Sequence, residues 1–267
     1  MKNNKHFLSV IIPVFCKEKS IKLDLIKINQ TLQKIRYDYE IIVVVDGKNS
    51  DNSYKIAKSL KIAKIKVFGY KHNRGKGHAI RFGINKCRGD YVAFLDAGME
   101  IDPNGISMLI EHLEWYKADV IVGSKRHPAS LVKYPLDRRI ISFGAQIIAK
   151  VLLGIKVKDT QAGIKIYKSN VLQKINPRLL VKTFAFDLEM LAVANRLGFK
   201  RIYEAPIKLN FNFQDLHLSG NTLKTIFVCL KDALAVFYRL RILKYYDDGT
   251  NRTWKYDKDL KMRINTG

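Results

Sequence analysis

The first half of the chain alternates short apolar runs with segments of helical periodicity, and this alternation constrains the fold more than any other feature. The apolar runs are LSVIIPV (8–14), YEIIVVV (39–45), AKIKVFGY (63–70), DYVAFLD (90–96) and DVIVGSK (119–125). Between the first two, apolar residues recur at steps of four and three, at Ile21, Leu25, Ile28, Leu32 and Ile35. Apolar strands between amphipathic helices predict an α/β fold, with a Rossmann-like, mostly parallel sheet covered by helices on both faces.

The charge of the chain requires an explanation. Lys and Arg number 48 against 24 Asp and Glu, which gives a formal charge of +24, and the hydrophobic share of 47% is enough for a full core. Three partners suit such an excess: nucleic acid, an anionic membrane surface, or phosphorylated small molecules. No nucleic-acid-binding motif with aromatic residues among the basic ones is present, so nucleic acid is not expected. The alternative is that many of the lysines only solvate the surface.

The cysteines and the N-terminus bear on where the protein works. The three cysteines, Cys16, Cys87 and Cys229, form no CxxC pair, which fits a reducing cytoplasm. The N-terminal MKNNKHFLSV lacks the apolar region of a signal peptide, and no stretch of about 18 apolar residues predicts a spanning helix.

Acidic residues follow two of the predicted strands. Asp46 ends one run, and Asp96 ends another in VAFLDAGMEIDP, where Glu100 and Asp102 come soon after. Ligands of open α/β sheets bind outside the carboxyl ends of the strands. Mg²⁺ or Mn²⁺ takes one or two protein carboxylates and leaves other positions to substrate phosphates. The stretch is therefore either a cation site or an ordinary acidic turn after a strand.

Two further stretches suit anions. In NRGKGHAIRFG (73–83), Gly75 and Gly77 allow a ligand close to the backbone, Lys76 and Arg81 add positive charge, and a helix begins here. The stretch is neither a Walker A motif nor a dinucleotide fingerprint, and a glycine turn capping a surface helix is the alternative. In GSKRH (123–127) and PLDRRIIS (135–142), the basic residues suit phosphate, or else solvate the start of a helix.

The second half changes character. Apolar helices edged by basic residues are predicted over 138–155 and 222–246, and the tail after them is predicted to be loose. Asp187 and Glu189 lie on a further helix, FAFDLEM, where positions two apart do not share a face. One of these two is expected to face the site and the other a structural partner. We expect one domain over 1–215, which includes 138–155, followed by a helix and polar tail over 216–267.

Eight stretches, in this order, resemble the family 2 glycosyltransferases of GT-A fold, and within them the polyprenyl-phosphate glucosyl- and mannosyltransferases. They are VIIPVFCKE, EIIVVVDG, NRGKGHAIRFG, GDYVAFLDA, VIVGSKR, RRIISFGA, KDTQAGIKIY and FAFDLEML. The resemblance runs from about Leu8 to about Leu240 and leaves the sugar open between glucose and mannose. It implies an inverting, metal-dependent hexosyltransferase that uses UDP-glucose or GDP-mannose.

The resemblance also implies roles for individual residues. The nucleotide-sugar contacts would be Pro13, Phe15, Glu18, Asp46, Lys76, Gly77, Asp96, Ala97 and Lys125. The catalytic residues would be Asp187 and Glu189 near the reacting sugar and Arg138 or Arg139 near the acceptor phosphate. Asp96 matches the first Asp of the family's DxD motif. Gly98 replaces the second, so Glu100 is expected to hold the cation together with Asp96. In the late segment LHLSGNTLK, His217 and Ser219 are candidates for acceptor contacts.

A phosphate acceptor would make a strong base unnecessary, because the second pKa of a phosphate monoester is about 6. A sugar hydroxyl as acceptor would instead require a carboxylate base such as Asp187 or Glu189. The two late apolar helices fit a peripheral position on the inner, cytoplasmic face of an anionic membrane. They could equally pack on the core or on a partner subunit, which leaves a homo-oligomer open. Transfer to a glycan hydroxyl and a non-catalytic nucleotide-sugar-binding protein are the alternative functions.

Overall fold

The computed structural model describes residues 6–131, 152–183, 185–210, 222–249 and 253–265, and the side chains of these residues except 222–229. Arg138, Arg139, His217 and Ser219, and most of the helix expected over 138–155, lie outside the described residues.

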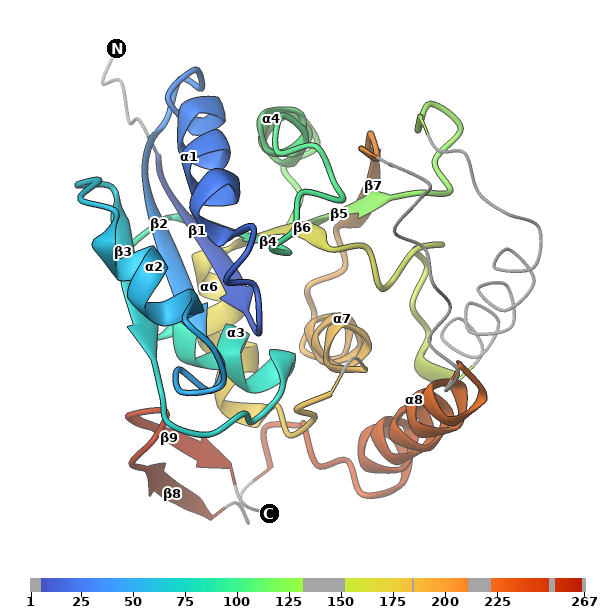
Figure 1. Cartoon of the computed structure of the whole chain (residues 1–267). Coiled ribbons are helices and arrows are strands. Elements are labelled where there is room, and N and C mark those ends of the chain that lie inside the picture. Colours follow the sequence, from blue (N-terminus) through green and yellow to red (C-terminus); the bar gives the residue numbers. More distant parts are fainter. Residues whose placement is uncertain (1–5, 132–151, 184, 211–221, 250–252, 266–267) are drawn as a thin grey trace.

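A seven-stranded sheet forms the centre of the molecule, with strand order β3-β2-β1-β4-β6-β5-β7 (Figure 1). The strands are β1 (Phe7–Val14), β2 (Asp38–Val45), β3 (Ile65–Gly69), β4 (Tyr91–Leu95), β5 (Val120–Ser124), β6 (Ile164–Lys168) and β7 (Ile202–Pro206). Every neighbouring pair is parallel except those that β6 makes with β4 and β5. The predicted α/β fold with a mostly parallel sheet is confirmed.

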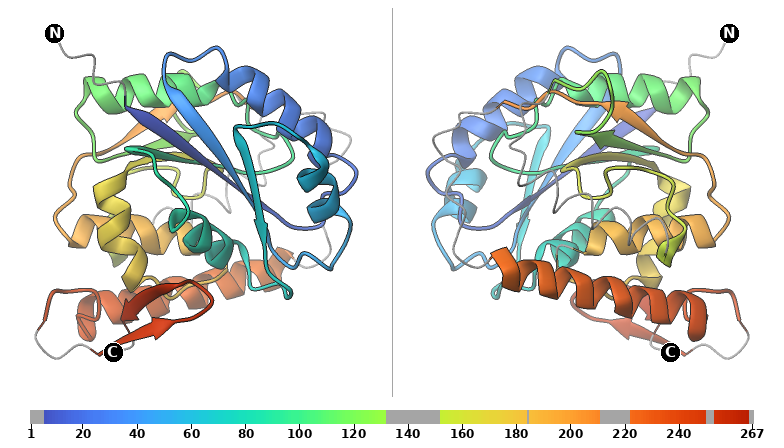
Figure 2. Two further views of the ribbon diagram at one scale, coloured as in Figure 1. Left: turned by 90° about the vertical axis from the view of Figure 1, so that its left-hand side faces the viewer. Right: turned by 90° about the vertical axis from the view of Figure 1, so that its right-hand side faces the viewer.

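Helices cover both faces of the sheet, so the molecule has three layers (Figures 1 and 2). Helices α1 (Ile21–Leu32), α2 (Ser53–Ser59) and α4 (Gly105–Trp115) pack on one face. On the other face lie α3 (Lys76–Ile84), α6 (Ser169–Ile175), the 3₁₀ turn η1 (Asn176–Arg178) and α7 (Phe186–Arg196).

The strands divide their side chains between two cores because successive residues of a strand point to opposite faces. In β2, Ile41 and Val43 join the core under α1 and α4, while Ile42 and Val44 join the core under α3 and α7. Helix α1 buries Ile21, Leu25, Ile28 and Leu32 of the predicted apolar stripe, and Ile35 follows the helix and is partly buried. Burial of each such side chain contributes roughly 1.5–3 kcal/mol.

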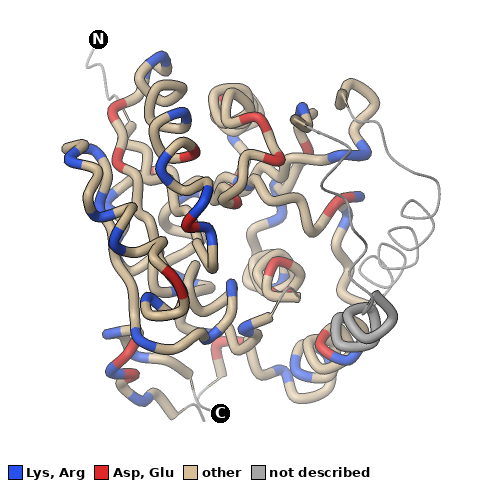
Figure 3. Tube along the Cα trace, viewed as in Figure 1, with Lys and Arg blue, Asp and Glu red and all other residues tan. Residues whose placement is uncertain are grey.

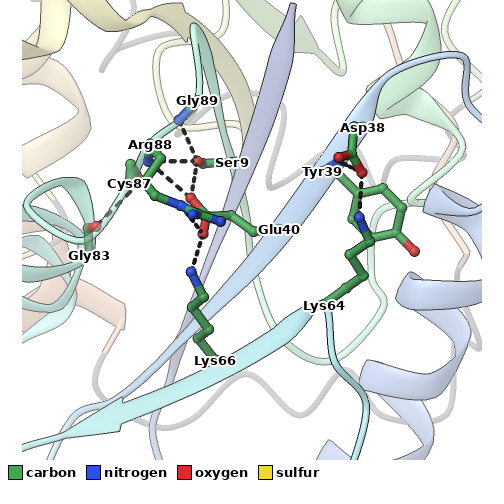
Figure 4. A network of polar contacts seen from close by, with 10 residues as sticks. All are labelled: Ser9, Asp38, Tyr39, Glu40, Lys64, Lys66, Gly83, Cys87, Arg88 and Gly89. Carbon is green, nitrogen blue, oxygen red and sulfur yellow. Dashed lines mark hydrogen bonds and ion pairs between the residues drawn. The ribbon is translucent and has the colours of Figure 1, made fainter.

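A buried glutamate connects β1 to β2 away from the carboxyl ends of these strands (Figure 4). Glu40 accepts hydrogen bonds from the Ser9 hydroxyl (2.8 Å), the Arg88 backbone N–H (2.9 Å) and Lys66 (2.8 Å). Burial alone would raise the pKa of Glu40, but Lys66, Ser9 and the Arg88 amide together hold it below its usual value. This network joins β1, β2 and β3 away from the carboxyl ends of the strands.

The C-terminal segment is built into the same core. Helix α8 (Thr222–Phe237) continues as one π-helical turn, η3 (Tyr238–Ile242), and lies against α7 (Figures 1 and 2). Val236, Leu240 and Tyr246 are buried in the cluster that also contains α7 residues. Among the described residues, no helix is both long and apolar enough to cross a bilayer.

The expectation of a loose tail is wrong. Strands β8 (Trp254–Asp257) and β9 (Met262–Asn265) form an antiparallel hairpin. Asn85, which follows α3 directly, donates to the carbonyl of Leu260 (2.9 Å). The Tyr245 hydroxyl donates to the carbonyl of Asn265 (2.7 Å). These anchors come from distant parts of the chain, so the polar composition of the tail did not reveal them.

Candidate active site

The site lies at the carboxyl edge of the sheet, where Asp96 follows β4. The Asp96 amide donates to the carbonyl of Gly163 (3.0 Å), which immediately precedes β6. Because β6 is antiparallel to β4, it begins at the edge where β4 ends. A Cβ atom on Gly163 would lie 2.4 Å from Oδ2 of Asp96, so only glycine leaves room for this carboxylate. The Asp96 side chain is 43% exposed and open to a ligand.

Lys76, the first residue of α3, pairs with Asp96. Its Nζ lies 2.8 Å from Oδ1 and 3.0 Å from Oδ2 of Asp96, and 3.6 Å from Oδ2 of Asp187. Burial alone would lower the pKa of Lys76, but the carboxylates of Asp187 and Asp96 outweigh it and raise that pKa. Lys76 therefore carries its charge at neutral pH. Arg81 on the same helix is buried, so Lys76 is the cation of this helix that faces the edge.

Asp187, in the first turn of α7, lies deeper than Asp96. Its Oδ1 accepts a hydrogen bond from Nζ of Lys165 (2.7 Å), and Lys165 also donates to the carbonyl of Ala162 (2.6 Å). Both side chains are almost fully buried. Burial alone would raise the pKa of Asp187, but Lys165 and Lys76 outweigh it and hold that pKa below its usual value.

Together these side chains form a charge tetrad in the order Asp96, Lys76, Asp187 and Lys165. The two carboxylates and two ammonium groups alternate, so each buried charge has an opposite neighbour. Sequence reasoning missed Lys165. Its signal was a lysine between Ile164 and Ile166 in an apolar strand, since a buried lysine requires a partner.

The loop that carries Lys76 is held from two sides. On one side, the oxygens of Asp46 accept from the amides of Arg74 (2.7 Å) and Gly75 (2.8 Å). On the other, the Gly77 amide donates to the carbonyl of Lys182 (3.0 Å). Gly75 has a φ of 95° and passes so close to Lys182 that a Cβ would lie 2.3 Å from its carbonyl oxygen. Asp46 therefore positions the loop, and its expected contact with a base or ribose stays a prediction.

Glu189 takes a different place from Asp187. Its carboxylate accepts from the amides of Leu180 (3.0 Å) and Val181 (2.9 Å) and from the hydroxyl of Tyr246 (2.6 Å). Burial raises the pKa of Glu189 despite these hydrogen bonds. The side chain has no exposed surface, which does not fit the catalytic role expected for it. The two acidic residues of this helix thus have different partners, as their spacing predicted.

The remaining predicted nucleotide contacts lie around the same edge. Pro13 is the second-to-last residue of β1, and Phe15 beyond the strand is 48% exposed. Glu18 accepts from the amide (3.0 Å) and side chain (3.1 Å) of Asn52 at the start of α2. Lys125 follows β5, and its amide donates to Asp159 (2.9 Å). Ala97 follows Asp96 directly. The contacts of these residues with a nucleotide stay predictions.

A divalent cation at this edge would take most of its ligands from a substrate. Gly98 provides no side-chain oxygen, and a Cβ there would lie 3.2 Å from Nζ of Lys17. Asp102 accepts from the amide (2.9 Å) and side chain (2.7 Å) of Asn104 at the start of α4, while Glu100 is exposed. Within the described ranges, no three His, Cys, Asp or Glu side chains cluster as metal ligands. Mg²⁺ or Mn²⁺ would suit a set of ligands made of Asp96, a substrate diphosphate and the carboxylate of Glu100, if its exposed side chain turned toward Asp96.

Comparison with known proteins agrees with the family inferred from the motifs. Residues 9–175, more than half of the chain, match the Glycosyl transferase family 2 domain, and the chain belongs to this family. It is 31% identical over 207 residues to a dolichyl-phosphate beta-glucosyltransferase of Dictyostelium discoideum, across 72% of this chain and 63% of that protein. The chain thus spans less than two thirds of that relative's length.

A second relative transfers a different sugar. A UDP-N-acetylglucosamine–dolichyl-phosphate N-acetylglucosaminyltransferase of Methanococcus voltae is 28% identical over 255 residues, across 88% of this chain and 95% of that protein. The human dolichyl-phosphate beta-glucosyltransferase is 28% identical over 273 residues, across 96% of this chain and 79% of that protein.

Solved structures support the GT-A fold. A glucosyl-3-phosphoglycerate synthase of Mycobacterium tuberculosis, in complex with Mn²⁺, UDP and phosphoglyceric acid, matches with a TM-score of 0.65 at 16% identity, across 97% of this chain and 86% of that one. A mannosyl-3-phosphoglycerate synthase of Rubrobacter xylanophilus matches with a TM-score of 0.64 at 15% identity, across 97% and 86%. At such low identity the likeness shows the fold alone.

Proposed function

We propose that the protein is an inverting glycosyltransferase that moves a hexose from a nucleoside diphosphate sugar to a polyprenyl phosphate. The dolichyl-phosphate sugar transferases among its relatives support this acceptor class, and they carry glucose or N-acetylglucosamine. The donors to test first are therefore UDP-glucose and UDP-N-acetylglucosamine, with GDP-mannose as the third.

The pairing of Asp187 is the observation that carries the choice of acceptor. Lys165 and Lys76 both lie against this carboxylate and lower its pKa, so Asp187 is a weak proton acceptor. A neutral sugar hydroxyl would need a base in the transition state. A phosphate monoester is largely ionised at neutral pH and attacks without one. The geometry of Asp187 favours the phosphate acceptor over the glycan hydroxyl.

The residues of the tetrad would then divide the work. Asp96 orients the donor at the strand end, and Lys76 turns from Asp96 toward the diphosphate as negative charge develops on the leaving group. Asp187, itself paired with Lys165, holds Lys76 from the buried side at a position from which it can reach the diphosphate. A divalent cation held by Asp96 and Glu100 would add further neutralisation of the departing diphosphate.

The helix α8 and its extension η3 present an apolar stripe that fits a membrane surface. Leu230, Leu234, Tyr238 and Ile242 repeat at steps of four and are 36% to 61% exposed. Exposed Lys231, Arg241 and Lys244 flank them, a pattern typical of helices that lie in the interface of anionic membranes. Elsewhere, Lys and Arg are spread along the whole described chain (Figure 3). We propose that this stripe rests on the cytoplasmic face of the membrane that holds the lipid acceptor.

The test is an incubation of each radiolabelled donor with polyprenyl phosphate and Mg²⁺ or Mn²⁺, followed by partition into organic solvent. Label in the organic phase is the expected result. Label only in water-soluble glycan would support transfer to a hydroxyl instead. Donor binding without any transfer would leave a nucleotide-sugar-binding protein. Sedimentation with phosphatidylserine vesicles, compared between the wild type and Leu234→Glu, tests the membrane contact separately.

A further inference from the structure

Residues 180–183 lie between the loop that carries Lys76 and the C-terminal helix, α8 with its extension η3. We call this stretch the support segment. The carbonyl of Lys182 accepts from the Gly77 amide (3.0 Å), and a Cβ on Gly77 would lie 2.7 Å from the carbonyl oxygen of Val181. The support segment is therefore the wall against which the loop bearing Lys76 rests.

The other side of the support segment borders an open pocket. The pocket, of about 250 Å³, lies between the segment and the C-terminal helix, where Ala235 and Arg239 line it. Val181 is buried in the core with residues of α7, but the side chains of Lys182 and Thr183 are exposed and do not fix the backbone by packing. The position of this backbone therefore also depends on the hydrogen bonds that it makes.

Those hydrogen bonds come from Glu189 and, through it, from the C-terminal segment. Glu189 accepts from the amides of Leu180 and Val181, and the Tyr246 hydroxyl donates to the same carboxylate (2.6 Å). Arg239 of η3 donates to that hydroxyl oxygen (3.0 Å). Thr183, at the end of the support segment, hydrogen-bonds Asp232 of α8.

We propose that Glu189 and Tyr246 are positioning residues of the glycosyltransferase site. Through the support segment they fix the loop that carries Lys76, so that the C-terminal segment completes the nucleotide site without touching the substrate. The assignment rests on the proposed function only in taking Lys76 as a ligand of the diphosphate. The chain of hydrogen bonds from Tyr246 through Glu189 and the support segment to Gly77 does not depend on the proposed function.

Two neighbouring tyrosines provide a matched pair of variants. In Tyr246→Phe the ring remains in the core, while the hydrogen bond to Glu189 and the one from Arg239 are lost. In Tyr245→Phe a hydroxyl bond of similar length is lost, but to the carbonyl of Asn265 in the hairpin (2.7 Å). A purely structural role for Tyr246 would leave exchange at 74–83 and the affinity for UDP the same in the two variants.

The first measurement is hydrogen exchange of the full chain without ligand, followed by mass spectrometry. In Tyr246→Phe we expect faster exchange in peptides covering 74–83 and 180–183, where the amides of Gly77, Leu180 and Val181 donate. In Tyr245→Phe exchange should rise in the hairpin instead. Equal exchange at 74–83 in wild type and Tyr246→Phe would overturn the proposal. If circular dichroism shows that Tyr246→Phe does not fold, Glu189→Gln is measured in its place.

The second measurement is the affinity for UDP by calorimetry. Tyr246→Phe should weaken it by up to about tenfold, because the free energy of one hydrogen bond to a charged group limits what can be passed on to the nucleotide site, and Tyr245→Phe should not weaken it. In a Lys76→Met background, Tyr246→Phe should have no further effect, because its influence passes through Lys76. Additive losses would refute the relay. Wild-type protein that binds no nucleotide would contradict the proposed function. The exchange measurement would still show whether Tyr246 holds the loop that carries Lys76.

Discussion

The ammonium group of Lys76 lies within hydrogen-bonding distance of both carboxylate oxygens of Asp96, at 2.8 and 3.0 Å. It thereby holds the position that a divalent cation would take on this carboxylate. Asp187, 3.6 Å from the same ammonium group, offers a second partner to which Lys76 can turn. The free protein thus neutralises Asp96 with its own side chain until a substrate arrives.

Replacing Lys76 should separate cation binding from catalysis. Lys76→Met removes the ammonium group that competes for Asp96, so Mn²⁺ should bind the free protein more tightly, as measured by electron paramagnetic resonance. Turnover should nevertheless fall by roughly 10²–10³, the usual loss for one charge-stabilising group. The exposed Lys55→Met on α2 is the control and should change neither. Weaker Mn²⁺ binding in Lys76→Met would contradict competition between the two cations.

The carboxylates beside Gly98 should differ in importance. Asp96→Asn should abolish most metal-dependent transfer, because Asp96 is the carboxylate at the strand end. Glu100→Ala should also lower it if Glu100 reaches the cation, and the apparent Mn²⁺ requirement should rise in initial-rate titrations. Wild-type rates and an unchanged Mn²⁺ requirement in Glu100→Ala would remove Glu100 from the site. Asp102→Asn, in the turn before α4, serves as the control.

Gly163 should tolerate no side chain. A Cβ there would meet the Asp96 carboxylate at 2.4 Å, so Gly163→Ala must shift Asp96. A displacement of about 1 Å at a reacting group can cost roughly 10²-fold in rate, and we expect a loss of this size in kcat/KM. At Gly105 a Cβ would make an ordinary contact of 3.4 Å with Ile164, so Gly105→Ala should stay near wild type. Equal activities of the two variants would mean that the rate does not depend on the observed position of the Asp96 carboxylate.

Lys165 should matter for stability as well as activity. Lys165→Met leaves Asp187 buried with one partner fewer, and losing a buried partner costs about 3–5 kcal/mol. Urea unfolding should therefore show a large loss for Lys165→Met and a smaller one for Lys165→Met/Asp187→Leu, which removes both charges. By comparison, Arg36→Ala breaks exposed pairs with Glu111 and Glu114 and should cost under about 1 kcal/mol. A double variant less stable than the single one would argue against a buried ion pair.

His78 should make stability depend on pH in the acid range. Burial lowers its pKa from 6.5 to about 4, together with nearby positive charges. The charged groups that act on it are Arg74, Arg81, Lys182 and Asp46. Since the native state binds fewer protons than the unfolded state, this contribution is complete above pH 6.5 and is lost as the pH falls toward about 4.

The loss should amount to no more than about 3.5 kcal/mol over that window. His78→Phe keeps a ring against Tyr70, whose centroid lies 5.0 Å away, and removes the titration. Urea unfolding of both proteins at pH 7.5, 6 and 5 checks this. The stability difference between wild type and His78→Phe should shrink or reverse as the pH falls. A difference that does not change with pH would show that His78 is not the group responsible.

Local patterns predicted the strands and helices of the first half well. The apolar stripe of α1 and the runs that became β1, β2 and β4 depend on residue spacing, which short stretches of sequence contain. The family also followed from motifs, because eight ordered stretches rarely arise by chance. The tail was mispredicted, since its hairpin is held by Asn85 and Tyr245, and polar composition carries no record of such anchors.

The sequence by itself determined that Asp46 and Asp96 end strands and that two acidic residues of α7 have different partners. Those features depend on spacing within one element. Only the tertiary structure decided which charges meet. Lys76, Asp96, Lys165 and Asp187 come from different elements, and the antiparallel course of β6 brings Lys165 to the edge where β4 ends. A buried charge must find an opposite charge, but the fold alone chooses which one.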